Sequence, residues 1–554
     1  MNKKVCSFPI LFALLALLIG TCAVVFPASA QAAPISTGSI TVSGTVASSY
    51  DAYQIFSANV IDGDKDAKIA TDLAWASDAV RDAALPVLHS AGMSKSQTTA
   101  QEAAEWLNTD SHLTSALSAQ LARSLQSSGA VFKALNAGTT AELPCGYWLI
   151  VADDDAIAEG EAGTAPIMTL VGGSAVTVKP KAATPKVAKH VLEDSTAAWQ
   201  KAADATVADD LYWRLSATVP AGLTAYDTYT VQFVDTMSAG LDLSKVAASM
   251  RVYVAAGADG GFDAVSAGKD GRAGTEPAKG WTDITAQCRV SVDGKTFTVR
   301  TGDLIAALGG ADAFTAGARV VAVYNAPLNS ACNHGIAKGN PNEVYLRYPR
   351  SPLADQSGDA GFTCTPSDDA CAYTWDLALT KRGSDGDKPL AGAVLSIADD
   401  RGRTLAVDGT WDAEGKATVT TGEDGRVAVS GVDSGKLEVR ELKAPKGYTA
   451  FEGTRSVTVK AEGLDVDQVA AAKPKLTITA ESPLRADSAD GSTGSLEVSL
   501  INSPAGTPPS IFTGGFMPST GDMAMYAAAA AAVAGATLIV VALLVKRGGG
   551  SHKE

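Results

Sequence analysis

The C-terminal end of the chain carries an apolar run that cannot lie on the surface of a water-soluble domain. Residues 523–545 contain no charged side chain. As a helix rising about 1.5 Å per residue, this run is long enough to cross the hydrocarbon core of a bilayer. Lys546 and Arg547 follow directly, and the enrichment of positive charge on the cytoplasmic side of membranes predicts a cytoplasmic C-terminus. Taken alone, the run also fits an ordinary C-terminal anchor helix or a buried helix.

The N-terminus has the features of a secretory signal peptide. Lys3 and Lys4 precede an apolar stretch from about Phe8 to Val25. Small residues at Ala28-Ser29-Ala30 then offer a cleavage site, and Ala30-Gln31-Ala32 offers a second one. We therefore expect residues 1–30 to be a signal peptide and the mature chain to be exported.

Composition limits the partners and the chemistry. The chain has 45 Lys and Arg against 60 Asp and Glu, a formal net charge of −15, and no long basic run, so nucleic acid is not expected as a partner. The five histidines show no metal-ligand spacing, and no phosphate loop or nucleophile–base motif stands out. The sequence therefore predicts no metal, no cofactor and no conventional enzyme.

The first mature region, residues 31–183, combines strands with helices. Alternating polar and apolar residues at 38–44 and an apolar stretch at 146–151 predict strands. Thr99 and Glu102 have the spacing of a capping box, which marks a helix start. A four-residue apolar spacing predicts one buried helix stripe, formed by Leu113, Leu117, Leu121 and Leu125.

The next two regions, 184–352 and 353–505, show short strand patterns separated by turn residues, which predicts two β-sandwiches. Residues 506–554 then form a linker and the apolar tail. The expected fold is mainly β, with tandem immunoglobulin-like sandwiches and a helical insertion in the N-terminal domain. Apolar residues make up 46% of the chain, which is normal for globular domains.

Five cysteines remain in the mature chain, and an exported protein can oxidise them. Cys364 and Cys371 are close enough in sequence for a local disulfide loop. Cys288 and Cys332 are a second candidate pair, which would leave Cys145 as a buried free thiol. Connectivity does not follow from spacing alone, so other pairings stay open.

The residues before the apolar run resemble the cell-wall sorting signal of Gram-positive surface proteins. The family pentapeptide is LPXTG, and this chain has Met517, Pro518, Ser519, Thr520 and Gly521, with Met in place of Leu. The resemblance implies that a sortase cleaves after Thr520 and transfers the new acyl group to an amine. The protein would then be a covalently attached surface component.

Over nearly its full length the chain resembles the major backbone pilins of sortase-assembled Gram-positive pili. Val178-Lys179-Pro180-Lys181 is similar to the pilin motif, although the family usually has an aromatic residue at the place of Lys179. The resemblance implies that Lys181 accepts the neighbouring subunit. The segment from Glu441 to Tyr448 is similar to the E-box, the most specific of the motifs. Three further similar segments are 231–241, 324–344 and 381–394.

The resemblance implies one intramolecular isopeptide bond in the C-terminal domain, which would be of CnaB type. Lys381 opens the domain and Asn502 falls on its last strand, so the two are expected to be joined, with Glu441 as the acid. Burial lowers the pKa of a lysine and raises that of a carboxyl group, which gives a free amine and an acid that polarises the amide. The bond forms once, with loss of ammonia, so it is self-processing without turnover.

A second bond is implied for the middle domain, which would be of CnaA type. It would join Lys189 to Asn329, with Asp235 as the acid. Lys186 competes with Lys189 for the role of the amine. The two lysines are three residues apart, so they cannot both point inward from a regular strand.

These resemblances imply a surface pilus and its partners. The expected partners are further copies of the chain, pilus-specific and housekeeping sortases, peptidoglycan, accessory pilins and host surface ligands. The competing hypothesis is a singly anchored adhesin or a minor basal or tip pilin. Lys181 discriminates, because a backbone subunit needs an acceptor lysine and a singly anchored adhesin does not.

Overall fold

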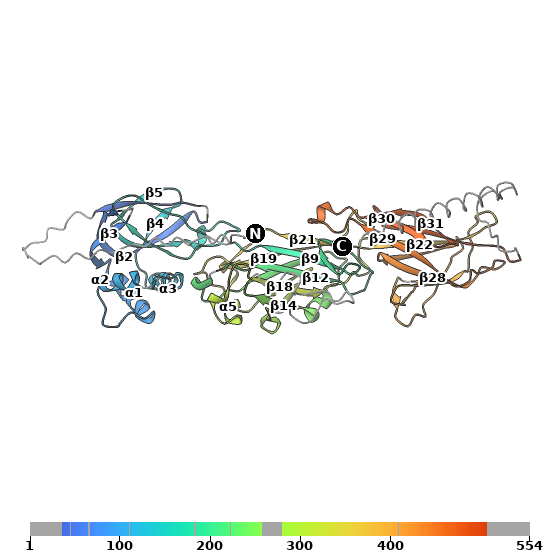
Figure 1. Ribbon diagram of the computed structural model, residues 1–554, viewed down its shortest axis with the longest axis horizontal. Helices are drawn as coiled ribbons and strands as arrows, with labels where there is room; N and C mark the ends of the chain where they lie inside the picture. Colours follow the sequence, from blue (N-terminus) through green and yellow to red (C-terminus); the bar gives the residue numbers. More distant parts are fainter. Residues whose placement is uncertain are drawn as a thin grey trace, which may run out of the picture.

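The computed structural model describes residues 36–506 apart from 45, 65–66, 110, 182–183, 222, 258–279 and 408. These residues form three groups of sheets in a row, which give the molecule its elongated shape (Figure 1). We call them the N-terminal unit (36–178), the middle unit (187–373) and the C-terminal unit (375–502). The expected signal peptide, Met517–Gly521 and the apolar run lie outside the described residues. Within the described part of the chain, no helix is long and apolar enough to span a membrane.

The N-terminal unit has two sheets and a helical layer, as expected from its sequence. One sheet has the strand order β5-β1-β8, and the other has the order β3-β2-β6-β7, with β4 paired to β2. The elements are β1 (Thr37–Val42), β2 (Ser49–Asp62), β3 (Lys68–Trp75), α1 (Asp78–Ser90), α2 (Ala100–Asn108), α3 (Ser115–Ser127), β4 (Lys133–Asn136), β5 (Thr140–Pro144), β6 (Gly146–Ala152), β7 (Ile167–Val171) and β8 (Val176–Val178).

The helices of this unit begin where their capping residues predict. Thr99 caps α2, and the reciprocal hydrogen bond from Glu102 completes the expected capping box. The predicted leucine stripe is also present, since Leu117, Leu121 and Leu125 of α3 are buried and Leu113 packs against the same cluster. The helices therefore cover one face of the β2 sheet (Figure 1).

The middle unit is a sandwich of two sheets around one large apolar core. Their strand orders are β10-β9-β12-β18-β14-β15 and β11-β21-β19-β13-β17-β16, with β20 paired to β19. The elements are β9 (Val187–Glu193), β10 (Ala198–Gln200), β11 (Ala202–Asp204), β12 (Tyr212–Thr218), β13 (Gln232–Met237), α4 (Val246–Ser249), β14 (Arg251–Ala255), β15 (Trp281–Asp283), β16 (Arg289–Asp293), β17 (Thr296–Arg300), α5 (Leu304–Ala307), β18 (Arg319–Asn325), β19 (Asn340–Pro349), β20 (Phe362–Cys364) and β21 (Asp368–Tyr373).

The end of the middle unit corrects the boundary expected at residue 352. Both β20 and β21 pair with β19, and β21 also pairs in parallel with β11, so residues up to Tyr373 complete the middle sheet. The sequence did not reveal this boundary, because the local pattern of a β-strand is the same in both sandwiches and does not tell which of the two the strand joins. The chain enters the next unit only at Trp375, where β22 starts.

The C-terminal unit is a second sandwich, so the expected mainly β fold is confirmed. Its sheets have the orders β27-β22-β32-β31 and β25-β24-β23-β28-β29-β30, with β26 paired to β23. The elements are β22 (Trp375–Gly383), β23 (Val394–Ala398), β24 (Thr404–Leu405), β25 (Trp411–Asp412), β26 (Val419–Thr420), β27 (Arg426–Val432), β28 (Gly435–Lys443), β29 (Thr454–Glu462), β30 (Lys475–Ala480), β31 (Leu484–Asp490) and β32 (Ser495–Asn502).

The expected disulfides are wrong, since all five cysteines of the described chain are free thiols. Cys364 lies opposite Arg347 on β19, whereas Cys371 lies opposite Pro341. Six residues of a strand span about 20 Å, far more than a disulfide can bridge. The thiol of Cys288 donates to the carbonyl of Ile284, and Cys332 Sγ lies 3.8 Å from His334 Nε2.

Candidate cross-linking sites

In the C-terminal unit the structure brings the three predicted side chains together. Lys381 comes from β22, Glu441 from β28 and Asn502 from the end of β32. The Nζ atom of Lys381 lies 3.4 Å from Glu441 Oε1, and Asn502 Nδ2 donates to both Glu441 oxygens at 2.9 and 3.0 Å. All three are buried, with Lys381 fully inaccessible. The amine, acid and amide are therefore in mutual reach inside an apolar core.

Strand alternation explains why a lysine is buried here. Leu377 and Leu379 point into the core cluster of the unit, and Lys381 follows at the next position of the same face. In the parallel pairing with β32, Lys381 lies opposite Leu500, two residues before Asn502. Side chains two residues apart on a strand point to the same face, so Leu500 and Asn502 share one face of β32. The amine of Lys381 and the amide of Asn502 are therefore neighbours.

Burial gives the amine the reactivity that cross-linking needs. Desolvation lowers the pKa of Lys381 to about 8, although the neighbouring Glu441 opposes the shift. A sizeable fraction of the amine is then neutral and nucleophilic near physiological pH. The carbonyl oxygen Oδ1 of Asn502 has no hydrogen-bond partner in the described chain. Since Glu441 holds the amide from its nitrogen side, the carbonyl carbon is left to the approaching amine.

The middle unit buries a similar cluster between its two sheets. Lys189 of β9 contacts the carboxyl group of Asp235 on β13, and both are fully buried. The Tyr324 hydroxyl of β18 lies 3.0 Å from Lys189 Nζ and donates to Asp235 at 2.9 Å. Asn342 of β19 in turn donates its Nδ2 to the same hydroxyl oxygen at 2.9 Å. An amine, an acid and an amide are thus linked through one tyrosine.

Asn329, the amide expected at this site, does not lie there. Its Nδ2 donates to the carbonyl of Ala239 at 3.0 Å, and its Oδ1 accepts from the amide of Ala331 at 2.8 Å. It caps a loop turn and is only half-buried. The residue that occupies the expected place is Asn342, which is fully buried. The sequence expectation is corrected from Asn329 to Asn342.

The position of Asn342 has a feature that is visible in the sequence. On β19, Asn342 alternates with Val344 and Leu346, which point into the core. In the pairing with β13, Asp235 lies opposite Val344 and Met237 opposite Asn342. Asn342 is thus a polar residue on the buried face of the strand that pairs with the strand of Asp235. Tyr324, which joins the amine to the amide, carried no such feature and was missed.

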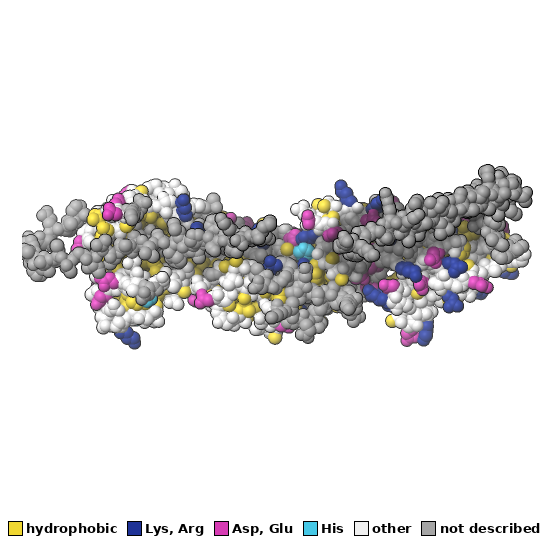
Figure 2. Space-filling model, viewed as in Figure 1, with side chains coloured by type: hydrophobic (Ala, Val, Ile, Leu, Met, Phe, Trp, Pro, Cys, Tyr) yellow, Lys and Arg dark blue, Asp and Glu magenta, His cyan; other side chains and the backbone are white. Residues whose placement is uncertain are grey.

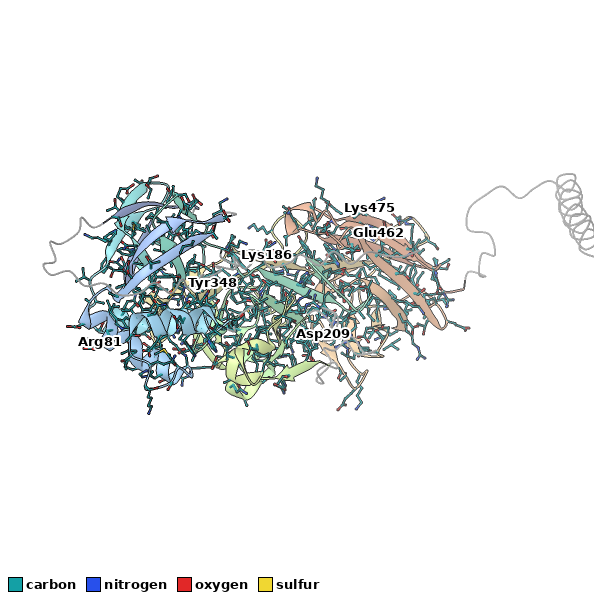
Figure 3. The ribbon with its side chains drawn as sticks, turned by 60° about the vertical axis from the view of Figure 1, so that its left-hand side comes forward. Arg81, Lys186, Asp209, Tyr348, Glu462 and Lys475 are labelled. Carbon is teal, nitrogen blue, oxygen red and sulfur yellow. The ribbon has the colours of Figure 1, made fainter. Side chains whose placement is uncertain are left out.

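Burial shifts both titrating groups of the middle cluster in the required directions. Desolvation lowers the pKa of Lys189 to about 8, against the attraction of Asp235. Desolvation also raises the pKa of Asp235, although Lys189 opposes it. The second oxygen of Asp235, Oδ1, has no hydrogen-bond partner in the described chain. By contrast, Lys186 is exposed at the junction of the N-terminal and middle units (Figure 3).

The expected acceptor lysine is accessible. Lys181 follows β8, which pairs in parallel with β1, and its side chain is exposed. Lys179 is exposed as well. On the face drawn in Figure 2, acidic and basic side chains are interspersed over the C-terminal unit, so no basic face is seen there.

Each of the two β-sandwiches buries a lysine, a carboxyl group and an asparagine. Residues 376–473 match the SpaA family model, which is described as a prealbumin-like fold domain. The chain is also 30% identical over 143 residues to the trypsin-resistant surface T6 protein of Streptococcus pyogenes serotype M6. That match covers 24% of this chain and spans 24% of the length of the relative. The SpaA-type domain is thus shown for residues 376–473, and the similarity to the T6 protein extends over 143 residues.

Solved structures of backbone pilins are similar at low identity. The T6 backbone pilin of Streptococcus pyogenes aligns with a TM-score of 0.46 and 16% identity, over 86% of this chain and 100% of that one. The full-length major pilin SpaD of Corynebacterium diphtheriae aligns with a TM-score of 0.41 and 15% identity, over 84% and 98%. The major pilin BcpA of Bacillus cereus aligns with a TM-score of 0.39 and 11% identity, over 85% and 99%.

Proposed function

We propose that the chain is the structural backbone subunit of a covalently polymerised surface pilus. The observation that carries the proposal is the pair of buried lysine–acid–asparagine clusters, which combines with an exposed Lys181 in the pilin-like motif. The N-terminal signal and the Met517–Gly521 motif, both expected from the sequence, would supply export and attachment.

The two internal cross-links form by one reaction. The neutral Nζ of Lys381 attacks the side-chain carbonyl carbon of Asn502, and a carbon–nitrogen bond forms. Glu441, which holds the amide nitrogen of Asn502, takes up the proton that the amine loses and passes it to the departing nitrogen, so ammonia leaves as the amide bond breaks. In the middle unit Lys189, Asn342 and Asp235 take the same roles. Proximity within a rigid core replaces a separate enzyme.

Polymerisation is a second and separate acyl transfer. A pilus-specific sortase cleaves the bond between Thr520 and Gly521, and the ε-amine of Lys181 on another copy takes the Thr520 acyl group. Since the donor and acceptor surfaces differ, repetition gives an open fibre and not a closed ring. The last subunit is transferred to the amine of the peptidoglycan cross-bridge by a housekeeping sortase.

The test is a surface extract examined by immunoblot under denaturing conditions. The wild-type strain should give a ladder of covalent multimers, and Lys181→Ala should give only wall-linked monomer. Lys179→Ala is the matched control, because Lys179 is exposed two residues away and should leave the ladder intact. A wild-type strain without a ladder would favour a singly anchored adhesin or a minor pilin. If the ladder persists in Lys181→Ala and is lost in Lys179→Ala, the acceptor is Lys179 and not Lys181.

A further inference from the structure

Acidic side chains from the middle and C-terminal units meet at the junction between these units. Glu193 ends β9 and Asp204 ends β11 in the middle unit, and both are buried, with exposed fractions of 3% and 2%. Asp433 approaches from the turn between β27 and β28 of the C-terminal unit. We call these three residues the acidic junction.

Hydrogen bonds tie the acidic junction to both units. Trp375 Nε1 donates to Asp204 Oδ2 at 2.6 Å, and the amide of Ser434 donates to the same oxygen at 3.0 Å. Both donors belong to the C-terminal unit, so Asp204 is a contact across the junction. The amide of Asp204 donates to Glu193 Oε2 at 3.1 Å. The second oxygen, Asp204 Oδ1, is buried and has no partner in the described chain.

The neighbouring arginines are engaged by other carboxylates. Arg403 makes a two-pronged contact with Asp209 at 2.5 and 2.6 Å, and Arg401 lies 3.2 Å from Asp194. Asp209 is at the junction of the two units in Figure 3. Among the described residues, no ion pair joins a cation to Glu193, Asp204 or Asp433. The other charged groups that face the junction or line its rim are Asp210, Asp399, Asp400 and Lys436.

A small cavity lies beside the acidic junction. Its volume is about 20 Å³, and its lining includes Asp194, Asp204, Asp209, Asp433 and Arg401. This is room for about one water molecule. Several carboxylates around so small a space repel one another strongly, because burial weakens the screening by water. The repulsion is relieved when protons are shared between the carboxyl groups.

The titration behaviour agrees with this geometry. Desolvation, followed by the charge of Asp204, raises the pKa of Glu193 to about 8. Desolvation and the charges of Asp204, Asp194 and Glu193 raise the pKa of Asp433 well above its ordinary value. The folded state therefore holds protons at pH values where the unfolded chain has released them. A group with a raised acid pKa favours the folded state at low pH, and this contribution is lost as the pH rises towards 8.

We propose that the acidic junction is a proton-binding site that holds the middle and C-terminal units together, and that proton release in mildly alkaline solution loosens their contact. Below that range Asp433 and Glu193 each hold a proton. Above it, three like charges face one another across the junction. In a pilus subunit, which is the function proposed above, the contact between the middle and C-terminal units would be tight in acid and looser in alkali.

Trp375 supplies a direct readout, because its indole N–H is bonded to Asp204. The full chain labelled with fluorotryptophan is titrated from about pH 5 to about pH 9 by fluorine NMR, with Trp375→Phe to assign the signal. We expect the Trp375 signal to titrate with a midpoint near 8. Asp433→Asn and Glu193→Gln should move or remove that midpoint. Asp400→Asn is the matched control, since this exposed rim residue should change nothing.

Two results would overturn the proposal. One is a Trp375 signal that does not change over this range; the other is a titration that survives unchanged in both Asp433→Asn and Glu193→Gln.

A third arm adds calcium ions at about pH 8. No group of three or more His, Cys, Asp or Glu side chains in the described chain is arranged to hold a metal. If the Trp375 signal shifts and saturates with calcium, the acidic junction binds a cation and not protons, and the proposal is overturned. Hydrogen exchange of β11 amides should speed up with pH in the wild type and not in Asp433→Asn.

Discussion

Lys381 and Asn502 lie on neighbouring parallel strands that are the first and the last strands of the C-terminal unit. Lys381 is opposite Leu500 in that pairing, and its Nζ also lies 3.4 Å from the Leu500 carbonyl. A bond between the two side chains would therefore join the points at which the chain enters and leaves the unit. Everything between them, residues 382–501, would become a closed loop.

The first prediction is the mass of the chain. Each cross-link releases one ammonia, so the wild type should weigh about 34 Da less than its sequence mass for two bonds. Glu441→Ala should recover about 17 Da, because the group that carries the proton to the amide nitrogen of Asn502 is missing. Glu438→Ala is the control, as this exposed residue lies on the same strand and should keep the wild-type mass. Intact-mass spectrometry measures these differences. A wild-type chain with the full mass of its sequence would contradict both bonds.

Loss of the cross-link should also lower stability. In chain-entropy theory, closing a loop of about a hundred residues contributes about 4–5 kcal/mol to the free energy of unfolding. We expect Glu441→Ala to lose an amount of this order in denaturant unfolding of the C-terminal unit. The Glu438→Ala control again separates the bond from a general effect of removing a carboxylate.

The second prediction concerns which asparagine is joined in the middle unit. Proteolysis of the wild type should yield a branched peptide that contains Lys189 and Asn342. Asn342→Ala should abolish the branch and restore about 17 Da, whereas Asn329→Ala should keep both the branch and the lower mass. A branch at Asn329, or one that contains Lys186, would contradict the geometry of the buried cluster.

The contrast between Asn329 and Asn342 shows how far the sequence reaches. Lys381 was expected from the resemblance to the opening strand of a CnaB-type domain, and in the structure it follows the core residues Leu377 and Leu379 on the same face of β22. The choice of the partner amide depends on which strands are neighbours, and pairing between strands 100 residues apart leaves no local pattern. Asn329 belongs to a similar motif but caps a turn, while Asn342 lies beside the strand of Asp235.

The cysteines and the domain boundary were mispredicted for the same physical reason. Cys364 and Cys371 are seven residues apart in sequence, yet they lie on β20 and β21, opposite positions of β19 that are six residues apart. Their strands return to the middle sheet, which also moves the boundary from residue 352 to about Thr374. By contrast, the helix starts in the N-terminal unit are local, and Thr99 with Glu102 was predictable.

The third prediction is a pH dependence that appears only when the C-terminal bond is absent. In Asn502→Ala, Lys381 remains a buried amine whose pKa is lowered to about 8, below its unfolded value of about 10.4. Between these values the unfolded chain binds more protons than the folded one, so stability rises with pH. The gain is at most about 3 kcal/mol. Denaturant unfolding at pH values of about 7 and 10 measures it.

The control for this third prediction is the double variant Lys381→Met with Asn502→Ala. Methionine has a similar length and no charge, so the rise in stability above about pH 8 should vanish. If both variants gain stability equally, the effect belongs to another group and the buried amine of Lys381 is not its source.

The last prediction is mechanical and follows from the closed loops. When the wild-type chain is pulled from both ends, force passes through Lys381, the cross-link and Asn502, so residues 382–501 cannot extend. Glu441→Ala should unfold this segment and add about 400 Å of contour length, at about 3.3–3.6 Å per residue. In the middle unit a bond to Asn342 leaves β20 and β21 outside the loop, so the wild type should still release about 130 Å between the two bonds. Single-molecule force spectroscopy measures both steps, with Glu438→Ala as the unchanged control. A wild type that releases the long step would show that β22 and β32 are not joined.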